Sequence, residues 1–348
     1  MANQYPEMLY PYTDLITLNN QSNNYTGVRI QNNVIGPNTN VDSQDGTKGR
    51  SGVVVTGPSS RTVYNLTIAD NRIFDAKGDG CGILLLGSIN TSAAPGLPGK
   101  YAGSVIDNNT ISGNHRSGIE FAGGVQGGPA PEERFRITNN TITDNGWRDK
   151  EEKDQIKYGN GIILIHVRSD SAPYNPLAWG SRYVSIENNQ VTGNEKNGIY
   201  IGPVNRDIAI TNNTIGDNGI GGPGYGTWDN IRVDLNEEYH NPPQNNHAFL
   251  SGIVVARNRI SGSGDYGLRV EGTPLAGPVD ARLNWWGHAS GPKATTGNPS
   301  GKGDRVSAGA AISPWYTNHE LTATSTDIPK PIVSFNWSPF EAMAGEDI

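Results

Sequence analysis

Two arginines and two carboxylates occur at matching positions in the second half of the chain. Arg232 and Asp234 are two residues apart, and Arg269 and Glu271 repeat that spacing in a similar segment. Side chains two residues apart on a strand point to the same face, so neighbouring strands would bring the four into a square. The square could be two structural cross-strand ion pairs of about 0.2–1 kcal/mol each. Alternatively, the guanidinium forks could bind the carboxylate of an acidic sugar.

Further side chains could take part in sugar chemistry, although each also has an ordinary structural explanation. Tyr200 could stack on a sugar ring or transfer a proton, and Glu120 could bind a cation together with loop oxygens. A histidine and an arginine end one predicted strand, and two tryptophans flank the predicted surface. The candidate catalytic residues are Tyr200, Arg232, Arg269 and His166. The candidate substrate-binding residues are Glu120, Asp234, Glu271, Arg168, Trp179 and Trp228.

A repeated unit must position these side chains, and residues 184–202 are its shortest complete copy. Each copy has an apolar residue three positions before an asparagine, then a polar turn and a Gly-apolar-x-apolar segment. Alternating apolar residues are typical of a strand with one buried face, and stacked copies would share one core. We expect the asparagines to adopt the left-handed conformation and to hydrogen-bond from coil to coil. They align at Asn33, Asn71, Asn109, Asn140, Asn189, Asn213, Asn258 and Asn284.

The positions of the insertions indicate which face is functional. Long insertions occur at only two turns of the unit, and both flank the Gly-apolar strand, whereas the asparagine turn has none. Loops at fixed corners of a solenoid wall in one face, and such loops often carry function. We therefore expect a groove over one outward row, which runs Val54, Leu84, Glu120, Ile163, Tyr200, Arg232 and Arg269.

The repeat resembles the right-handed parallel β-helix proteins, the class that includes the pectate lyase-like enzymes. The predicted fold is thus an all-β solenoid of about seven or eight coils with long insertions on one face. Segments 281–292 and 303–316 look like the carboxy-terminal cap of β-helix domains in microbial surface proteins, with Trp285, Trp286 and Trp315 over the core end. The predicted division is 1–24 partial coil or cap, 25–280 β-helix, 281–318 carboxy-terminal cap, and 319–348 linker and truncated start of an immunoglobulin-like module.

The resemblance implies a polysaccharide ligand but assigns no catalytic residue. The sequence lacks the Gly-His-Gly motif of polygalacturonases, the Asp-Pro-His-Asp motif of mannuronan epimerases and the pectinesterase pattern. Arginine with tyrosine or histidine would suit proton removal beside a uronate carboxyl. We therefore expect binding of an extended acidic polysaccharide, with lyase or epimerase chemistry if the protein is an enzyme. The alternative is a non-catalytic surface scaffold, adhesin or surface-layer domain.

Composition and sequence features narrow the possible ligands, cellular location and cofactors. The 348 residues carry a net charge of -7, which gives no reason to expect nucleic-acid binding. There is no signal peptide and no apolar run long enough for a membrane span, and the lone Cys81 excludes a disulfide framework. Residues 332–348 resemble the start of a polycystic-kidney-disease-type module, so we expect a fragment of a longer extracellular or cell-surface protein. Ca²⁺, for example at residues 75–79, is the one cofactor considered, and no metal ligands are assigned.

Overall fold

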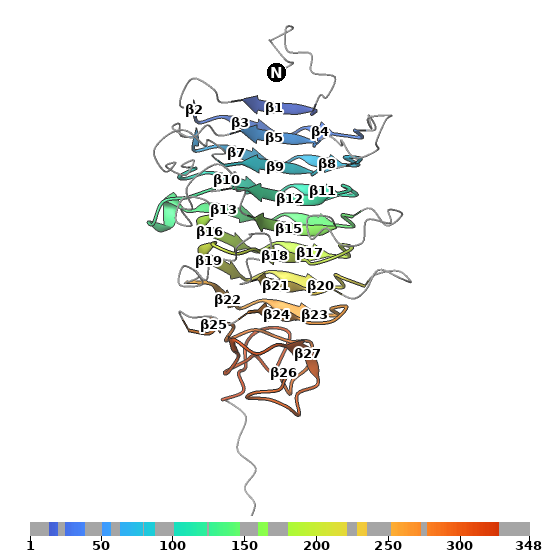
Figure 1. The fold of residues 1–348 in the computed structure, drawn as a ribbon, viewed down its shortest axis with the longest axis vertical. Coiled ribbons are helices and arrows are strands. Elements are labelled where there is room, and N and C mark those ends of the chain that lie inside the picture. Colours follow the sequence, from blue (N-terminus) through green and yellow to red (C-terminus); the bar gives the residue numbers. More distant parts are fainter. Residues whose placement is uncertain are drawn as a thin grey trace, which may run out of the picture.

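Parallel strands stacked into coils make up the computed structural model (Figure 1). It describes residues 14–19, 25–38, 51–56, 63–78, 80–87, 101–123, 125–146, 159–165, 180–220, 228–234, 252–272 and 277–326. Within these residues the only helical element is the short 3-10 helix η1 (Pro131–Glu133). Most coils contribute one strand to each of three long sheets, and neighbouring strands of a sheet come from successive coils.

The ten-stranded sheet contains the Gly-apolar segments of the repeat. Its order is β1 (Ile16–Asn19), β5 (Val53–Thr56), β9 (Ile83–Leu86), β12 (Ser117–Ala122), β15 (Asn160–Ile165), β18 (Ile199–Ile201), β21 (Ile231–Asp234), β24 (Leu268–Glu271), β27 (Gly303–Val306) and β26 (Pro292–Ala294).

The other two long sheets lie before and after the asparagine turn. The nine-stranded sheet is β28 (Ala310–Ala311), β25 (Val279–Asp280), β22 (Val254–Ala256), β19 (Arg206–Thr211), β16 (Arg182–Glu187), β13 (Phe135–Thr138), β10 (Val105–Asp107), β7 (Thr67–Ala69) and β3 (Arg29–Gln31). The seven-stranded sheet is β23 (Arg259–Ser261), β20 (Thr214–Gly216), β17 (Gln190–Thr192), β14 (Thr141–Thr143), β11 (Thr110–Ser112), β8 (Arg72–Phe74) and β4 (Val34–Ile35). A short pair is formed by β2 (Tyr25–Thr26) and β6 (Val63–Tyr64).

Stacked β-branched side chains form one continuous core. Ile106 is in register with Ile68 on one side and Ile137 on the other, and all three are fully buried. Equivalent rows of isoleucine and valine run through all three long sheets. No coil could bury these faces alone, so each gains its core from its neighbours. The predicted right-handed parallel β-helix is confirmed.

The predicted asparagine ladder is present in full. From Asn71 to Asn284, each side-chain carbonyl accepts the Nδ2–H of the preceding ladder asparagine at 2.9–3.0 Å, and Asn33 is the first donor. One detail of the prediction is wrong, because the left-handed residue is the one before each ladder asparagine, with φ between 51° and 58°. The bend therefore lies one residue earlier, and it leaves the ladder asparagine free to point inward.

Two further ladders were not predicted. Asn114, Asn145, Asn194 and Asn218 follow the first ladder by five residues, and their side chains are joined at 2.8–2.9 Å. A third, shorter ladder joins Asn160 to Asn197 at 2.9 Å. These buried amides pair with one another, which removes the cost of burying an unpaired polar group.

The carboxy-terminal end of the core is occupied by tryptophan. Trp286 is fully buried in the core cluster, and the half-buried Trp315 packs against that cluster. The segment 332–348, in which we expect the truncated module, lies outside the described residues, as do residues 1–13. In the described part of the chain, no helix has the length and apolar character needed to span a bilayer.

The first ladder gives a stability prediction. Asn189→Leu removes the amide that joins Asn140 to Asn213, so it should lower the free energy of unfolding by about 1–3 kcal/mol. Gln190→Leu is the matched control, because Gln190 directly follows Asn189 and its side chain is exposed. This substitution should change stability by less than about 0.5 kcal/mol. Chemical denaturation measures both. Equal effects of the two substitutions would contradict a structural ladder.

Candidate functional site

The seven side chains expected in one outward row do share one row. The register runs Val54, Leu84, Glu120, Ile163, Tyr200, Arg232 and Arg269 across successive strands of the ten-stranded sheet. The row changes character along its length. Its middle members Glu120 and Ile163 are fully buried and Tyr200 is 2% exposed, whereas Arg232 and Arg269 are half-buried. The segments expected to wall this row lie largely outside the described residues.

Glu120 is a fully buried carboxylate that contacts Arg116 and Cys81. Arg116 approaches both oxygens of its carboxylate, with Nε–Oε2 at 2.7 Å and Nη2–Oε1 at 2.5 Å. The Cys81 thiol donates to Oε2 at 3.2 Å, and burial together with this carboxylate raises the pKa of Cys81. The carboxylate that we considered for cation binding is therefore enclosed by protein groups. Cys81 is enclosed with it.

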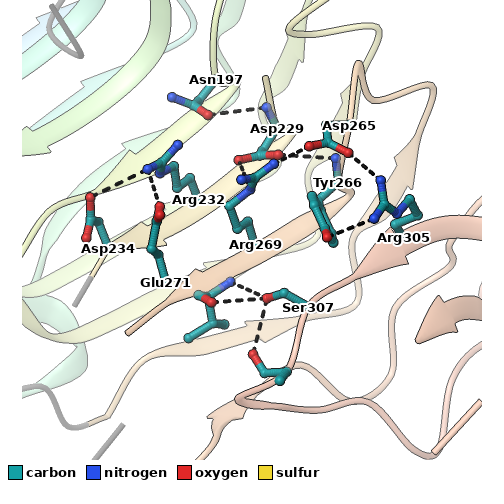
Figure 2. A network of polar contacts seen from close by, with 12 residues as sticks. Asn197, Asp229, Arg232, Asp234, Asp265, Tyr266, Arg269, Glu271, Arg305 and Ser307 are labelled. Atoms are coloured by element: carbon teal, nitrogen blue, oxygen red, sulfur yellow. Dashed lines mark hydrogen bonds and ion pairs between the residues drawn. The ribbon is translucent and has the colours of Figure 1, made fainter. Parts of the chain in front are cut away.

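The square of two arginines and two carboxylates is only half formed. Arg232 pairs with Glu271 across the strands and lies 3.9 Å from Asp234 (Figure 2). Asp234 in turn accepts the Tyr200 hydroxyl at 3.1 Å. The Arg232 guanidinium also lies over the Trp228 ring, 5.8 Å from its centroid. Three consecutive coils thus contribute to one group of contacts.

Arg269 does not pair with the other members of the square. Its side chain turns toward the start of β24, where Nε lies 2.9 Å from Oδ2 of Asp229 and Nη2 contacts Asp265 (Figure 2). Asp265 also binds Arg305 at 2.6 Å. The expectation of two cross-strand pairs within the square is therefore wrong for Arg269, because two nearer carboxylates compete for it.

Tyr266 lies between two guanidinium groups. Arg269 is 4.5 Å from the ring centroid and Arg305 is 4.2 Å from it. Arg305 also donates to the Tyr266 hydroxyl at 2.9 Å. Cations over an aromatic face are attracted by the ring quadrupole, so the ring helps to hold both arginines close together despite their like charge.

Asp229 is the group that sequence reasoning missed. It follows Asn160 and Asn197 in the third ladder, and its Oδ1 accepts the backbone N–H of Tyr266 at 3.1 Å. Its Oδ2 is buried and close to Arg269, although the contact is not aligned as a hydrogen bond. Burial raises the pKa of Asp229 to about 6, against the opposing charges of Arg269 and Arg232. An aspartate just before the Asn230-Ile231 pair, where two other copies have asparagine, was the available signal.

We call this group of residues the polar strip. It comprises Tyr200, Trp228, Asp229, Arg232, Asp234, Asp265, Tyr266, Arg269, Glu271 and Arg305. Lys196 lies beside it, with Nζ 4.8 Å from the centroid of the Trp228 ring. Every charged residue of the strip contacts an opposite charge. The strip therefore combines carboxylates, guanidinium groups and aromatic faces.

The remaining candidates are placed as follows. His166, Arg168 and Trp179 lie outside the described residues, so their roles stay predictions. Among the residues that the structure describes, no group of three or more His, Cys, Asp or Glu side chains could hold a metal ion. At the segment considered for Ca²⁺, Asp75 lies 3.7 Å from Lys77.

The Asp229 environment predicts a dependence of stability on pH. The pKa of about 6 exceeds the ordinary value of 3.8, so the folded chain holds this proton more tightly than the unfolded chain. Protonated Asp229 therefore stabilises the folded chain below pH 4. This contribution to the free energy of unfolding is lost as the pH rises toward 6, by up to about 3 kcal/mol. Asp229→Asn should abolish this loss, because an asparagine also fits the ladder.

Chemical denaturation of both proteins between pH 4 and pH 7 measures the difference. Asp217→Asn, at an exposed aspartate, is the matched control. A constant difference in stability between the unmutated protein and Asp229→Asn across this range would contradict the prediction.

The Glu120 environment predicts a structural effect. Glu120→Ala leaves Arg116 without its carboxylate beside the buried Cys81, and removing one partner of a buried ion pair costs about 3–5 kcal/mol. Thermal and chemical unfolding should both show this loss. Glu132→Ala, at an exposed glutamate, should have little effect. Equal stability of the two variants would show that the buried pair contributes nothing.

Several solved structures resemble this chain weakly. They include the A-module of mannuronan C-5 epimerase AlgE6 from Azotobacter vinelandii, with 15% identity, a TM-score of 0.34, and coverage of 76% of this chain and 74% of that one. Dettilon tailspike protein has 15% identity, a TM-score of 0.34, and coverage of 82% of this chain and 51% of that one.

A third similar structure is DFA-IIIase from Arthrobacter chlorophenolicus A6 in complex with GF2, with 13% identity, a TM-score of 0.31, and coverage of 85% and 64% of the two chains. This chain thus spans about half of the tailspike and less than two thirds of the DFA-IIIase. No curated protein sequence matches it. The sequence profile described as "Right handed beta helix region" matches residues 13–273, which is most of the chain. The chain therefore belongs to the right-handed β-helix family.

Proposed function

We propose that this chain is a carbohydrate-active protein that binds an extended polysaccharide along the polar strip. The observation that carries the proposal is that Tyr200, Arg232 and Arg269 share one row on consecutive coils, surrounded by carboxylates and aromatic rings. A polysaccharide repeats along its length as the coils do, and offers hydroxyl groups and apolar ring faces. Carboxylates accept hydrogen bonds from hydroxyls, guanidinium groups donate them, and aromatic rings stack on sugars. Polysaccharides are also the usual ligands of this fold class, which supports the proposal by analogy.

An acidic polysaccharide would fit best at Arg232. Its partner Glu271 is 36% exposed, whereas Arg269 is held by both Asp229 and Asp265. A uronate carboxylate that replaced Glu271 would keep Arg232 paired and release Glu271 to water. Arg269 would then hold the strip together instead of contacting the sugar. This assigns the two arginines different roles.

The same contact would support lyase or epimerase chemistry. Both reactions begin with removal of the proton on the carbon beside the uronate carboxyl, and that step requires neutralisation of the carboxyl charge. Arg232 would provide the neutralising charge. Tyr200, whose hydroxyl donates to Asp234, would take up that proton while its own hydroxyl proton passes to the Asp234 carboxylate. We place this activity outside the cell or at its surface, where a protein would meet such polymers.

A non-catalytic surface scaffold is the second candidate function. It is favoured by the mutual neutralisation within the strip, because every arginine there already contacts a carboxylate. Under this alternative the ion pairs only tie the last coils together. Surface ion pairs of this kind are worth about 0–1 kcal/mol each.

Two single substitutions separate these functions. If the strip binds an acidic glycan, Arg232→Ala should weaken binding at least about tenfold, because a charge-assisted contact of about 1.5–3 kcal/mol is lost. Glu271→Gln removes the competing carboxylate but keeps Arg232, so binding should stay equal or become tighter. Glycan arrays and calorimetry with alginate, pectate and glycosaminoglycan oligomers measure binding, and the ultraviolet absorbance of unsaturated products reports β-elimination.

The scaffold gives the opposite pattern. Arg232→Ala and Glu271→Gln would then lower the free energy of unfolding by similar amounts, and the double variant would add little, since both break one pair. Glycan binding would be unaffected. Absence of binding by the unmutated protein to any acidic or neutral glycan, together with absence of unsaturated product, would contradict the proposed function.

A further inference from the structure

A second group of arginines lies at the corner that follows the ten-stranded sheet, outside the polar strip. Arg182 begins β16 and Arg206 begins β19, and these residues are paired in register on neighbouring coils. Arg206 belongs to the same coil as Tyr200, a short turn after the end of β18. The pair therefore flanks the row that contains the strip.

Neither arginine of this pair has an ion-pair partner among the described residues. In that part of the chain the Arg206 side chain makes no hydrogen bond or ion pair, and the Arg182 guanidinium lies near the Tyr183 ring, 5.2 Å from its centroid. The Arg182 Nε is buried and has no hydrogen-bond partner there. This contrasts with the polar strip, where each arginine has a carboxylate. Like charges on directly opposed strand positions destabilise a sheet.

The groups around the pair do not cancel its charge. Asp207 and Tyr183 act to raise the pKa of Arg206, but burial and the charge of Arg182 outweigh them and lower it. Asp207 forms no ion pair with either arginine among the described contacts. Arg134 adds a third positive charge, and its guanidinium donates to the carbonyls of Val184 at 2.9 Å and Asp207 at 2.6 Å. The charges of Asp207 and Glu187 both act on Arg134. Three arginines thus face two carboxylates, and the corner keeps an excess of positive charge.

The backbone beneath the pair is firmly held. The Arg206 N–H donates to the Ser181 carbonyl at 3.0 Å, and the Ser181 N–H donates to Oδ1 of the fully buried Asn205 at 2.7 Å. The Arg182 carbonyl accepts the Gly127 N–H at 3.1 Å. A site whose groups are positioned before binding loses less entropy when a ligand arrives.

We propose that Arg182 and Arg206 form an anion-binding site for a carboxylate or sulfate group. Strands of neighbouring coils are about 4.8 Å apart, so two guanidinium groups can approach one oxyanion from adjacent coils. Guanidinium forks match such groups in shape and charge. Binding at the accessible terminal nitrogens of the guanidinium groups would relieve the repulsion between the like charges. The inference does not rest on polysaccharide binding at the strip, and it applies to a free anion or to one carried by a glycan.

Calorimetry with the full chain tests this site. The probes are sodium sulfate against sodium chloride at equal ionic strength, and a sulfated oligosaccharide against its desulfated form. We expect Arg206→Gln and Arg182→Gln each to weaken anion binding at least about tenfold. Arg72→Gln, at an exposed arginine on the seven-stranded sheet, is the matched control and should bind as the unmutated protein does. Binding of free sulfate would identify a small-anion site, and binding of the sulfated oligosaccharide alone would identify a glycan-borne anion.

Stability gives an independent readout. At low ionic strength, Arg206→Gln should melt at the same temperature as the unmutated protein or higher, because it removes a repulsion, and sulfate should no longer raise its melting temperature. A lower melting temperature with unchanged sulfate binding would assign Arg206 a structural role and overturn the proposal. Absence of binding of every anionic probe to the unmutated protein would also overturn it. Arg232→Ala should leave sulfate binding intact. Loss of ligand binding at the polar strip is therefore distinguishable from loss of anion binding at Arg182 and Arg206.

Discussion

The hydrogen bond between stacked asparagine side chains is the interaction on which the rest of this structure depends. A buried amide is costly unless its donors and acceptor are paired, and each ladder asparagine finds its partner only when the coils are in register. Ile106 and Ile137 lie in the same register as Asn109 and Asn140, so the ladder and the core enforce one another. That register also aligns the outward row that ends in Arg232 and Arg269 (Figure 2).

Two of the ladders end at carboxylates near the carboxy-terminal coils. A carboxylate accepts hydrogen bonds but cannot donate them, so a ladder can end at an aspartate and cannot continue through its side chain. The second ladder continues from Asn218 to Asn230 at 2.9 Å and ends at Asp304, which accepts Nδ2–H of Asn230 at 3.3 Å and the Ser263 N–H at 3.0 Å. Asp229 ends the third, and its second oxygen faces Arg269. The strip thus begins where a chain of neutral amides meets an ionised group.

The fold was predictable from the sequence because its signals are local and repeated. An apolar residue three positions before an asparagine, isoleucine in six of the eight copies, fixes which side chains face inward and makes that phase unambiguous. The second ladder has an equally local signal, since Asn114 and Asn145 follow the first ladder by five residues. The partners of Arg269 could not be predicted, because a long side chain chooses among several carboxylates by its rotamer. Asp229 comes from another coil, and its proximity to Arg269 exists only after folding.

The direction of the hydrogen bonds determines how the molecule responds to mechanical force. Strand pairings and asparagine bonds both join one coil to the next along the long axis of the solenoid (Figure 1). Tension applied at the two ends therefore stretches the bonds of one coil interface at a time, and coils would peel away in succession. Force across the axis must instead shear the bonds of all three sheets together. An added coil lengthens such a rod without weakening any existing interface, so reach and strength are independent properties of this architecture.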